Sequence, residues 1–396
     1  MISVAELDDL LSEVVLPVQD ETVGIDSAVG RVLSEEIVAD RDIPPFDRVC
    51  MDGFALRWDE WSTGRREFAL SGSSPAGAPR HPAPGPGSCV EVTTGAPAPI
   101  GCDLVVRIED SQAQGDDVVF RSEHVLRGQN LHWRGSEARA GATILAPGTR
   151  IGPAELGVLA SVGAHRLRVR TLPRIAVCST GDELVEVQET PLPHQIRRSN
   201  DRFVASTLER HGFAVDRLFP IRDESARVHE ALEKALERHD VVIVSGGVSA
   251  SARDLVPETL LALGVRCIAH GVAQKPGKPF WTGIGPQGQF VAALPGNPMA
   301  AAVCFRRYAL PVLLRNAGLP PSRRTVRLSA PVERQGKLVR YVACKVREVE
   351  ACLVAEVVSG NGSGDYLHLA GTDGFLQIEP GTTAMVAGAL AEFLPW

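Results

Sequence analysis

Residues 240–254 read Asp-Val-Val-Ile-Val-Ser-Gly-Gly-Val-Ser-Ala-Ser-Ala-Arg-Asp. The apolar, β-branched residues Val241 to Val244 predict a strand buried on both faces, as in the middle of a parallel sheet. The strand should end at Ser245-Gly246-Gly247, and Pro257 with the leucines that follow it indicates a helix soon afterwards. Such a turn can bind an anion, because glycines let backbone N–H groups approach phosphate closely. For one Gly-Gly pair alone, a tight turn without a ligand is the simpler alternative.

Two more loops stiffened by proline and glycine follow this stretch. They read Lys275-Pro-Gly-Lys278-Pro279 and Pro295-Gly296-Asn297-Pro298, and each is expected at a strand end. Three such loops at one edge of a sheet predict a site for an anionic ligand. Lys275 and Lys278 would neutralise that ligand as point charges.

The bulk composition predicts a globular protein of several domains. The 396 residues are 44% hydrophobic and carry a net charge of −7, which argues against a nucleic-acid or anionic-membrane surface. No apolar run approaches the roughly 20 residues of a membrane span, and the acidic N-terminus lacks the features of a signal peptide. The eight cysteines form no C-x-x-C pair. They therefore predict reduced thiols and a cytoplasmic protein.

The first half of the chain divides into helical and β-rich parts. Ser3 and Glu6 form a capping box for an amphipathic helix, and a second short helix is expected over 27–35. The period then changes to two, which predicts a β-rich domain over 45–145 inserted between helical pieces. A helix over 154–161 could pack on the first helix. Residues 1–44 and 146–172 would then form one discontinuous subdomain.

The second half predicts an α/β domain over 173–322 and a β-barrel over 323–396. Strands alternate with helices expected at 201–211, 224–238, 255–263 and 299–314. Pro311 should kink or end the last helix. After Pro320-Pro321 the short strands and glycine-rich turns are typical of a small barrel.

Several carboxylates stand beside glycine turns: Asp52, Asp182, Glu183 and Asp254. Each alone is most simply a turn or cap residue. Together with the lysines and glycine loops they indicate a site where carboxylates hold Mg²⁺ and Mg²⁺ bridges phosphate oxygens. Thr94 could add a hydroxyl and a backbone N–H. No H-x-x-x-H, G-x-S-x-G or Walker loop occurs, which disfavours a zinc enzyme, a hydrolase triad and a P-loop kinase.

The segment Pro44-Pro-Phe-Asp-Arg-Val-Cys-Met-Asp-Gly-Phe-Ala55 resembles the P-x-F-D-x-S-x-M-D-G-Y-A signature of the molybdopterin molybdenumtransferase family, which includes MoeA and the gephyrin E-domain. Further motifs resemble that family in the same order: Thr94-Gly-Ala-Pro97, Arg134-Gly135, Ser179-Thr-Gly-Asp-Glu-Leu184, Ser245-Gly-Gly-Val-Ser249 with Asp254, Lys275-Pro-Gly-Lys-Pro279 and Leu294-Pro-Gly-Asn-Pro298.

The resemblance implies a multidomain α/β and β fold. The protomer would be elongated and have four subdomains: a central molybdopterin-binding α/β domain, an inserted β-rich domain, the discontinuous helical part and a C-terminal β-barrel. It also implies an antiparallel homodimer with two composite sites. The implied reaction inserts molybdate into adenylylated molybdopterin with Mg²⁺ assistance and release of AMP.

The resemblance also assigns roles to residues. Asp52 is the first-choice catalytic carboxylate, with Glu183 and Asp254 beside it. The metal would be held by Asp182, Glu183, Asp254 and Asp223, and Glu137 is a weaker candidate. Substrate binding falls to the remaining motif residues: Thr94, Gly246, Gly247, Ser249, Lys275, Lys278, Pro295, Gly296, Asn297 and Pro298.

The chain departs from the family pattern at two positions of the anion-binding loops. Ser251 stands where the family has glycine, and Gly271 stands where many members have lysine. A non-inserting paralogue that binds molybdopterin or a partner protein therefore remains an alternative. A molybdopterin adenylyltransferase is a second alternative, which the Met51-Asp52-Gly53 domain argues against, and a scaffold protein is a third.

Overall fold

The computed structural model describes residues 1–17, 19–122, 124–217, 220–248, 255–319, 323–334, 336–360 and 365–396. These residues form two compact units. The first unit comprises residues 1–21, 30–32 and 169–396, and the second comprises 22–29 and 33–168. The finer division into four subdomains, with the bounds given above, stays a prediction.

The first unit is built on a six-stranded sheet. Four neighbouring strands run parallel, and two antiparallel strands complete one edge. In spatial order the strands are β16 (Val215–Arg217), β13 (Ile175–Ser179), β17 (Val241–Ser245), β21 (Phe290–Leu294), β20 (Trp281–Ile284) and β18 (Arg266–His270). The strand predicted at Val241 to Val244 is therefore confirmed as an interior, fully buried strand.

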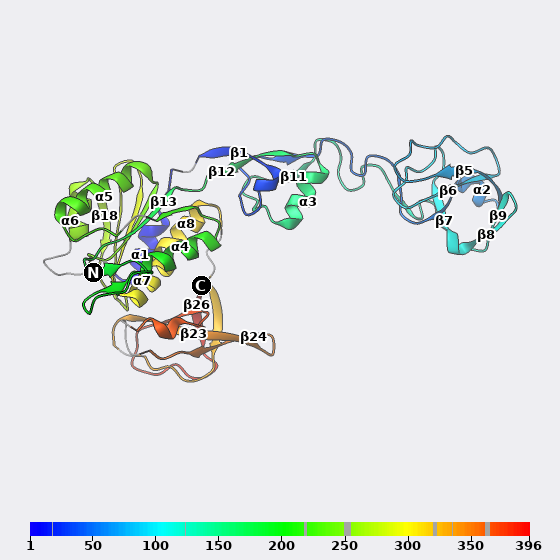
Figure 1. Cartoon of the computed structure of the whole chain (residues 1–396). Helices are drawn as coiled ribbons and strands as arrows, with labels where there is room; N and C mark the ends of the chain where they lie inside the picture. The colour runs from blue at the N-terminus through cyan, green and yellow to red at the C-terminus, as the bar shows by residue number, and fades with distance from the viewer. Residues whose placement is uncertain are drawn as a thin grey trace. The chain divides into compact units, whose positions relative to one another are not determined.

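Helices cover both faces of this sheet (Figure 1). Alternate residues of β17 divide between two cores: Val242 and Val244 face one, and Val241 and Ile243 face the other. The first core is closed by α5 (Ser225–Arg238) and α6 (Leu255–Ala262). The second is closed by α1 (Val4–Ser12), α4 (Asn200–Arg210), α7 (Pro298–Cys304) and α8 (Leu310–Asn316). This two-sided burial explains why the strand is apolar at every position.

Three local predictions have clear outcomes in the first unit. The capping box of Ser3 and Glu6 begins α1 as expected. Pro311 does not end its helix, because a π-helical segment, Phe305–Ala309, joins α7 to α8 and the helix continues to Asn316. A π-bulge relaxes the hydrogen-bond pattern of the helix next to the proline, which has no N–H to donate. The buried residues Leu310, Val312, Leu313 and Leu314 hold α8 in the hydrophobic core. The helix expected over 224–238 is confirmed as α5 (Ser225–Arg238), with Glu224 as its N-cap residue.

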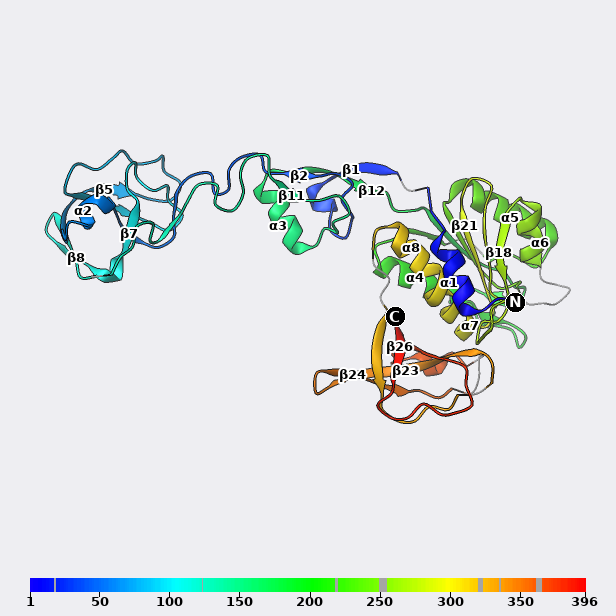
Figure 2. The same cartoon turned by 180° about the vertical axis from the view of Figure 1, so that it is seen from behind.

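The predicted C-terminal barrel is confirmed as five strands closed into a ring, because β23 pairs with both β24 and β25. Its strands are β22 (Arg324–Leu328), β23 (Val339–Val349), β24 (Cys352–Val357), β25 (Gly374–Ile378) and β26 (Leu390–Pro395). Tyr341 and Phe375 belong to the same hydrophobic core as α7 and α8, so the barrel packs on the α/β part of this unit (Figure 2).

The second unit contains the predicted β-rich domain. Its six-stranded sheet has the order β7 (Leu104–Arg107), β4 (Gly53–Leu56), β6 (Ser88–Val92), β5 (Glu67–Ser74), β9 (Asp117–Phe120) and β8 (Ser111–Gln114). Phe54 and Phe68 pack edge-on against Phe120 in its core. The helix expected at 154–161 is confirmed as α3 (Pro153–Ser161).

The second helix expected over 27–35 is wrong. A 3₁₀ turn, Ile25–Ser27, is followed by extended chain, in which Leu33 N–H donates to the Thr149 carbonyl oxygen and Ser34 N–H to that of Arg168. Long-range pairing therefore overrides the local helical pattern. The remaining short elements are β1 (Asp20–Gly24), β2 (Ile37–Val38), β3 (Arg48–Val49), α2 (Trp58–Trp61), β10 (Leu131–His132), β11 (Thr143–Leu145), β12 (Arg166–Arg170), β14 (Leu184–Val185), β15 (Ile196–Arg197) and β19 (Gln274–Lys275).

All eight cysteines are free thiols. Burial raises the pKa of the Cys178 thiol to about 12, so this cysteine stays protonated. Within the described ranges, no helix combines the length and apolar character needed to span a membrane.

Candidate functional site

The main pocket of the first unit has a volume of about 350 Å³ and lies at the carboxyl ends of β13, β17 and β21. In open α/β sheets this edge is the usual ligand site. Most of its lining comes from the segments that follow these strands: Ser179, Thr180, Gly181, Glu183, Leu184, Ser245, Gly246, Gly247, Val248, Gly296 and Pro298. Two of the three loops predicted to form an anion site therefore meet here.

Glycine is required at both positions of the turn after β17. Gly246 has φ +102°, and a Cβ there would lie 2.4 Å from the Thr180 carbonyl oxygen. Gly247 has φ +63°, and its Cβ would lie 2.8 Å from Val256 Cγ2. The turn therefore presents bare main chain to the pocket, which is the arrangement that lets backbone N–H groups approach an anion.

Two buried hydroxyl groups in the wall of the main pocket have no hydrogen-bond partner among the described residues. Ser179 is 2% exposed and Thr180 is 4% exposed, and the side-chain oxygens of both are unpaired. Buried polar atoms in folded proteins are nearly always hydrogen-bonded. Their oxygens are almost inaccessible in this conformation, so a polar ligand could complete their bonding only after the side chains rotate toward the pocket.

Asn200 ties the two glycine loops together, and sequence reasoning missed it. Its side-chain amide donates to Ser245 Oγ at 2.7 Å and to the Gly296 carbonyl oxygen at 2.8 Å. Arg197 and Arg198 line the same pocket and were also missed. In the sequence, these residues belong to the polar run before the helix expected over 201–211. Taken alone, such a run indicates only the start of a helix.

The carboxylates predicted to hold Mg²⁺ come together only in part. Glu183 and Asp223 line the main pocket, whereas Asp182 Oδ1 accepts a hydrogen bond from the Asp223 N–H at 3.2 Å. Asp254, Ser249 and Ser251 lie outside the described residues. Within the described ranges no three His, Cys, Asp or Glu side chains form a metal-binding group. Mg²⁺ is commonly held by one or two carboxylates with substrate phosphates and water, and Glu183 and Asp223 are the two carboxylates in the described lining of this pocket.

Lys275 lies in a different pocket from the glycine loops. This barrel-side pocket, of about 210 Å³, is lined from the α/β part by Lys275, Pro276 and Met299, and from the barrel by Arg340, Tyr341, Val342, Ala343, Val357, Val358, Ser359, Gly360 and His368. Lys278 is exposed and belongs to the described lining of neither pocket. Pro295 is buried and Asn297 half-buried, in the same segment as the pocket-lining Gly296 and Pro298.

Strand pairing fixes Lys275 next to Arg340. β19 runs parallel to β23 with Lys275 and Arg340 as register partners. The neighbouring Gln274 is 1% exposed, donates to the Pro276 carbonyl oxygen at 2.9 Å, and accepts from the Tyr308 hydroxyl. This buried anchor holds the loop, so Lys275 and Arg340 both contribute to the lining of one pocket. The Arg340 guanidinium also donates to the Glu333 carbonyl oxygen at 3.1 Å.

Asp52 and Thr94 meet in the second unit, as their proximity to glycine turns suggested. The Thr94 N–H and hydroxyl both donate to Asp52 Oδ1, at 2.6 and 2.8 Å. These bonds, the backbone one first, lower the pKa of the exposed Asp52 carboxyl below its ordinary value. Gly53 allows the turn to pack, because a Cβ there would lie 2.0 Å from the Val106 carbonyl oxygen. Asp52 is thus an ionised acceptor at neutral pH.

Arg134 and Glu137 take part in ion pairs near this turn. Arg134 donates from Nε to Asp42 at 2.9 Å, and Glu137 lies 3.3 Å from Arg48 and 3.4 Å from His132. The Ala140 N–H, followed by Arg134, lowers the pKa of Asp42. Glu137 therefore has two basic neighbours within its own unit, which is consistent with its lower rank as a metal ligand.

Three family models match nearly the whole chain. They are the MoeA N-terminal region (domains I and II) over residues 2–163, the probable molybdopterin binding domain over 176–315, and the MoeA C-terminal region (domain IV) over 325–396.

Relatives and solved structures agree with these matches. A molybdopterin molybdenumtransferase of Synechocystis sp. is 36% identical, with all of both chains covered. One from Bacillus subtilis is 29% identical, covering 95% of this chain and 90% of the relative. The crystal structure of the molybdopterin biosynthesis MoeA protein of Pyrococcus horikoshii has a TM-score of 0.85 at 26% identity, covering 100% of this chain and 99% of that one. From its motifs, fold and relatives, the chain belongs to the MoeA family of molybdopterin molybdenumtransferases.

Proposed function

We propose that this chain is a molybdopterin molybdenumtransferase, a transferase of molybdenum cofactor biosynthesis that inserts molybdate into adenylylated molybdopterin and releases AMP. The observation that carries the proposal is the main pocket, whose lining combines bare glycine turns with two hydroxyl-bearing residues, Ser179 and Thr180, within the family's molybdopterin-binding region. A pterin joined to a nucleotide through phosphates offers the acceptor oxygens that such a pocket requires.

In this proposal the main pocket binds the phosphates of adenylylated molybdopterin. The Gly247 backbone N–H, the Arg197 side chain, and the hydroxyls of Ser179 and Thr180 once turned toward the ligand would offer donors to them. The Gly246 N–H donates to the Leu294 carbonyl oxygen at 3.0 Å and holds the turn itself. Asn200 keeps the two loops in register through its bonds to Ser245 and Gly296. Mg²⁺ bound by Glu183 and Asp223 would neutralise phosphate charge and assist departure of AMP.

The barrel-side pocket would hold molybdate. Lys275 and Arg340 supply two positive charges for a doubly charged oxyanion, and Ser359 and His368 add further polar groups to the same lining. Guanidinium and ammonium groups bind oxyanions through short charge-assisted hydrogen bonds. Binding the anion would relieve the repulsion between the two cations, so the site favours an occupied state.

Asp52 would act as an ionised acceptor during insertion. Its lowered pKa excludes it as a proton donor at neutral pH, which leaves the roles of base or ligand. Thr94 orients it with two hydrogen bonds. In line with the family resemblance, we infer a homodimer in which one protomer supplies Asp52 and its partner supplies the pockets.

The test is a reaction containing the purified chain, adenylylated molybdopterin, molybdate and Mg²⁺. AMP release should depend on molybdate, and one molybdenum should be incorporated for each AMP released. Tight binding of adenylylated molybdopterin without either product would favour the non-inserting paralogue. Omitting Mg²⁺ in a parallel reaction tests the metal assignment separately. The cytoplasmic location remains a prediction from the scattered cysteines.

A further inference from the structure

A third cavity of the first unit lies beside the outermost strand, away from the chemistry described above. It has a volume of about 1110 Å³ and runs between β16 and one face of α5. We call it the basic groove because six cations line it: Arg174, Arg217, Arg222, Arg227, Lys234 and Arg238.

Three of these cations have no acidic partner within the described ranges. Asp240 binds Arg174 at 2.9 Å, and Glu230 lies 2.6 Å from Lys234 and 3.8 Å from Arg227. Arg217, Arg222 and Arg238 are the three without such a neighbour, and the groove contains only two acids, Asp216 and Glu230. A positive surface of this kind on a chain of net charge −7 is a local feature, which favours an acidic ligand.

The edge of β16 offers a second recognition element. In the described structure β16 has β13 as its one neighbouring strand, so its other edge is open. The side chain of Asp216 is 76% exposed, and Arg217 is also exposed. An open strand edge carries main-chain N–H and C=O groups that can pair with an extended polypeptide.

The groove and the main pocket share one short segment of chain. Ile221 and Arg222 line the groove, whereas the adjoining Asp223 lines the main pocket. Ile221 also forms a bridge with Thr180 in the pocket wall, and its carbonyl oxygen accepts from the Gly181 N–H at 3.2 Å. A ligand in the groove would therefore lie one segment away from the proposed pterin-nucleotide site.

We propose that the basic groove docks an extended acidic segment of a partner protein, which adds to β16 as a strand and places carboxylates against Arg217, Arg222 and Arg238. The role that we assign to the partner rests on the function proposed above: the partner delivers the ligand of the main pocket or receives the product. The strand edge and the groove's own two acids favour a polypeptide over a nucleic acid, whose continuous phosphates would meet Asp216 and Glu230.

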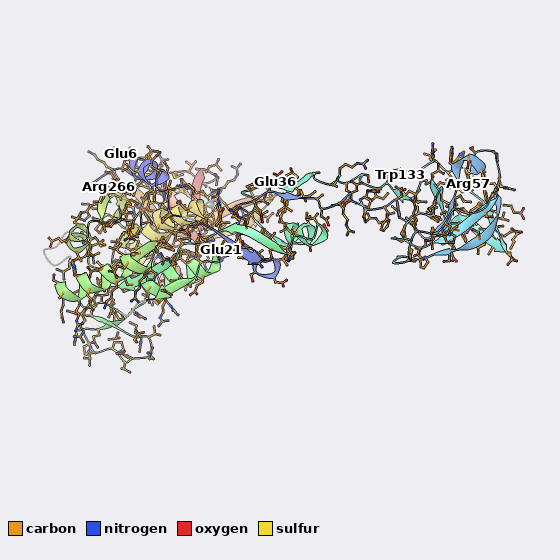
Figure 3. All side chains as sticks on the ribbon, turned by 90° about the horizontal axis from the view of Figure 1, so that it is seen from above. Glu6, Glu21, Glu36, Arg57, Trp133 and Arg266 are labelled. Carbon is orange, nitrogen blue, oxygen red and sulfur yellow. The ribbon has the colours of Figure 1, made fainter. Side chains whose placement is uncertain are left out.

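The first test uses a fluorescein-labelled peptide of five Glu-Val repeats, followed by fluorescence anisotropy at low salt. The variant carries Arg217→Glu, Arg222→Glu and Arg238→Glu together. Arg266→Glu is the matched control, because Arg266 is exposed on β18 at the opposite edge of the sheet (Figure 3). The wild-type chain and the control should bind the peptide equally, and the triple variant at least about tenfold more weakly. Hydrogen exchange of residues 215–217 should slow when the peptide is added.

Three results would overturn the docking proposal: no binding by the wild-type chain, equal binding by the triple variant, or equal affinity for a thymidine decanucleotide that competes with the peptide. A circular-dichroism melt of the triple variant separates lost docking from lost folding, and the milder Arg→Gln set replaces it if it unfolds. With free adenylylated molybdopterin, the triple variant should release AMP at the wild-type rate. Peptide binding without AMP release by the wild-type chain would instead contradict the proposed function alone.

Discussion

Lys275 and Arg340 are register partners in a parallel pair of strands, so the structure holds two cations side by side where the α/β sheet meets the barrel. Like charges in this position repel each other and cost stability. The buried Gln274 and the tight Gly277 turn nevertheless keep the loop in place; a Cβ at Gly277 would lie 2.4 Å from Cys304 Sγ. Two basic residues on neighbouring strands at one pocket are what an oxyanion site requires.

Replacing Lys275 by alanine should weaken molybdate binding without lowering thermal stability, because Lys275 is exposed. Arg340→Ala should weaken molybdate binding as well, but it also removes the hydrogen bond to the Glu333 carbonyl oxygen. We expect the molybdate concentration for half-maximal AMP release to rise at least about tenfold, which corresponds to about 1.4 kcal/mol of binding free energy. Lys337→Ala, at an exposed lysine of the same unit, is the control. A lower melting temperature with unchanged molybdate dependence would make Lys275 a structural residue.

Gly246→Ala should abolish binding of adenylylated molybdopterin and destabilise the first unit. The new Cβ would combine an unfavourable φ with a 2.4 Å contact to the Thr180 carbonyl oxygen. Gly288→Ala is the matched control, since Gly288 has φ +88° and open space around it, so only the backbone strain of about 1–2 kcal/mol remains. Isothermal titration and thermal melts separate the two effects. Normal ligand affinity in Gly246→Ala would contradict the assigned role of the turn.

Ser179→Ala combined with Thr180→Val should leave the free protein as stable as the wild type, or more stable. Both hydroxyls are buried without partners, so their removal spares a desolvation cost of about 1–3 kcal/mol each. Affinity for adenylylated molybdopterin should fall. The comparison is Thr282→Val. The buried Thr282 hydroxyl donates to the Val291 carbonyl oxygen at 2.9 Å, so its removal should lower the stability of the free protein. A marked loss of stability in the double variant would indicate a structural role.

Thr94→Val should raise the pKa of Asp52 only part of the way towards the ordinary value of about 3.9, because the Thr94 N–H, the larger cause, remains. The folded-state pKa lies below the unfolded one. The stabilisation from this contact is therefore present above the unfolded pKa and is lost as the pH falls through the folded pKa. Carboxyl NMR titration measures the shift. Thr93→Val, whose hydroxyl accepts from the Ala76 N–H, should leave it unchanged. An unchanged pKa in Thr94→Val would contradict the hydroxyl contribution.

The sequence predicted the main pocket well, because its parts follow from local patterns. Apolar β-branched runs identify parallel strands, parallel strands end at one edge, and glycines mark the turns there. Gly246, Gly247, Gly296 and Pro298 therefore appear where they were expected. Asn200 escaped prediction because its two partners, Ser245 and Gly296, are far away in sequence.

The barrel-side pocket could not be derived in the same way. Lys275 was expected beside the glycine loops, but a strand pairing with the distant Arg340 fixes its place. Ser359 and His368 follow ordinary barrel strands, and no local pattern distinguishes them. The effect of Pro311 could not be predicted from local sequence either. The contacts that its helix makes in the hydrophobic core outweigh the tendency of proline to end a helix.

The division of the site between two chains is tested most directly by complementation. The assay uses a molybdate concentration far below that needed by Lys275→Ala, so that an Asp52→Ala chain and a Lys275→Ala chain are each nearly inactive in the proposed scheme. Their mixture is refolded and assayed for molybdenum incorporation. A heterodimer should regain about half the activity of a wild-type dimer, because one of its two sites receives Asp52 and Lys275 intact while the other receives both substitutions. No recovery, with subunit exchange demonstrated by tagged chains, would mean that each site is built within one chain.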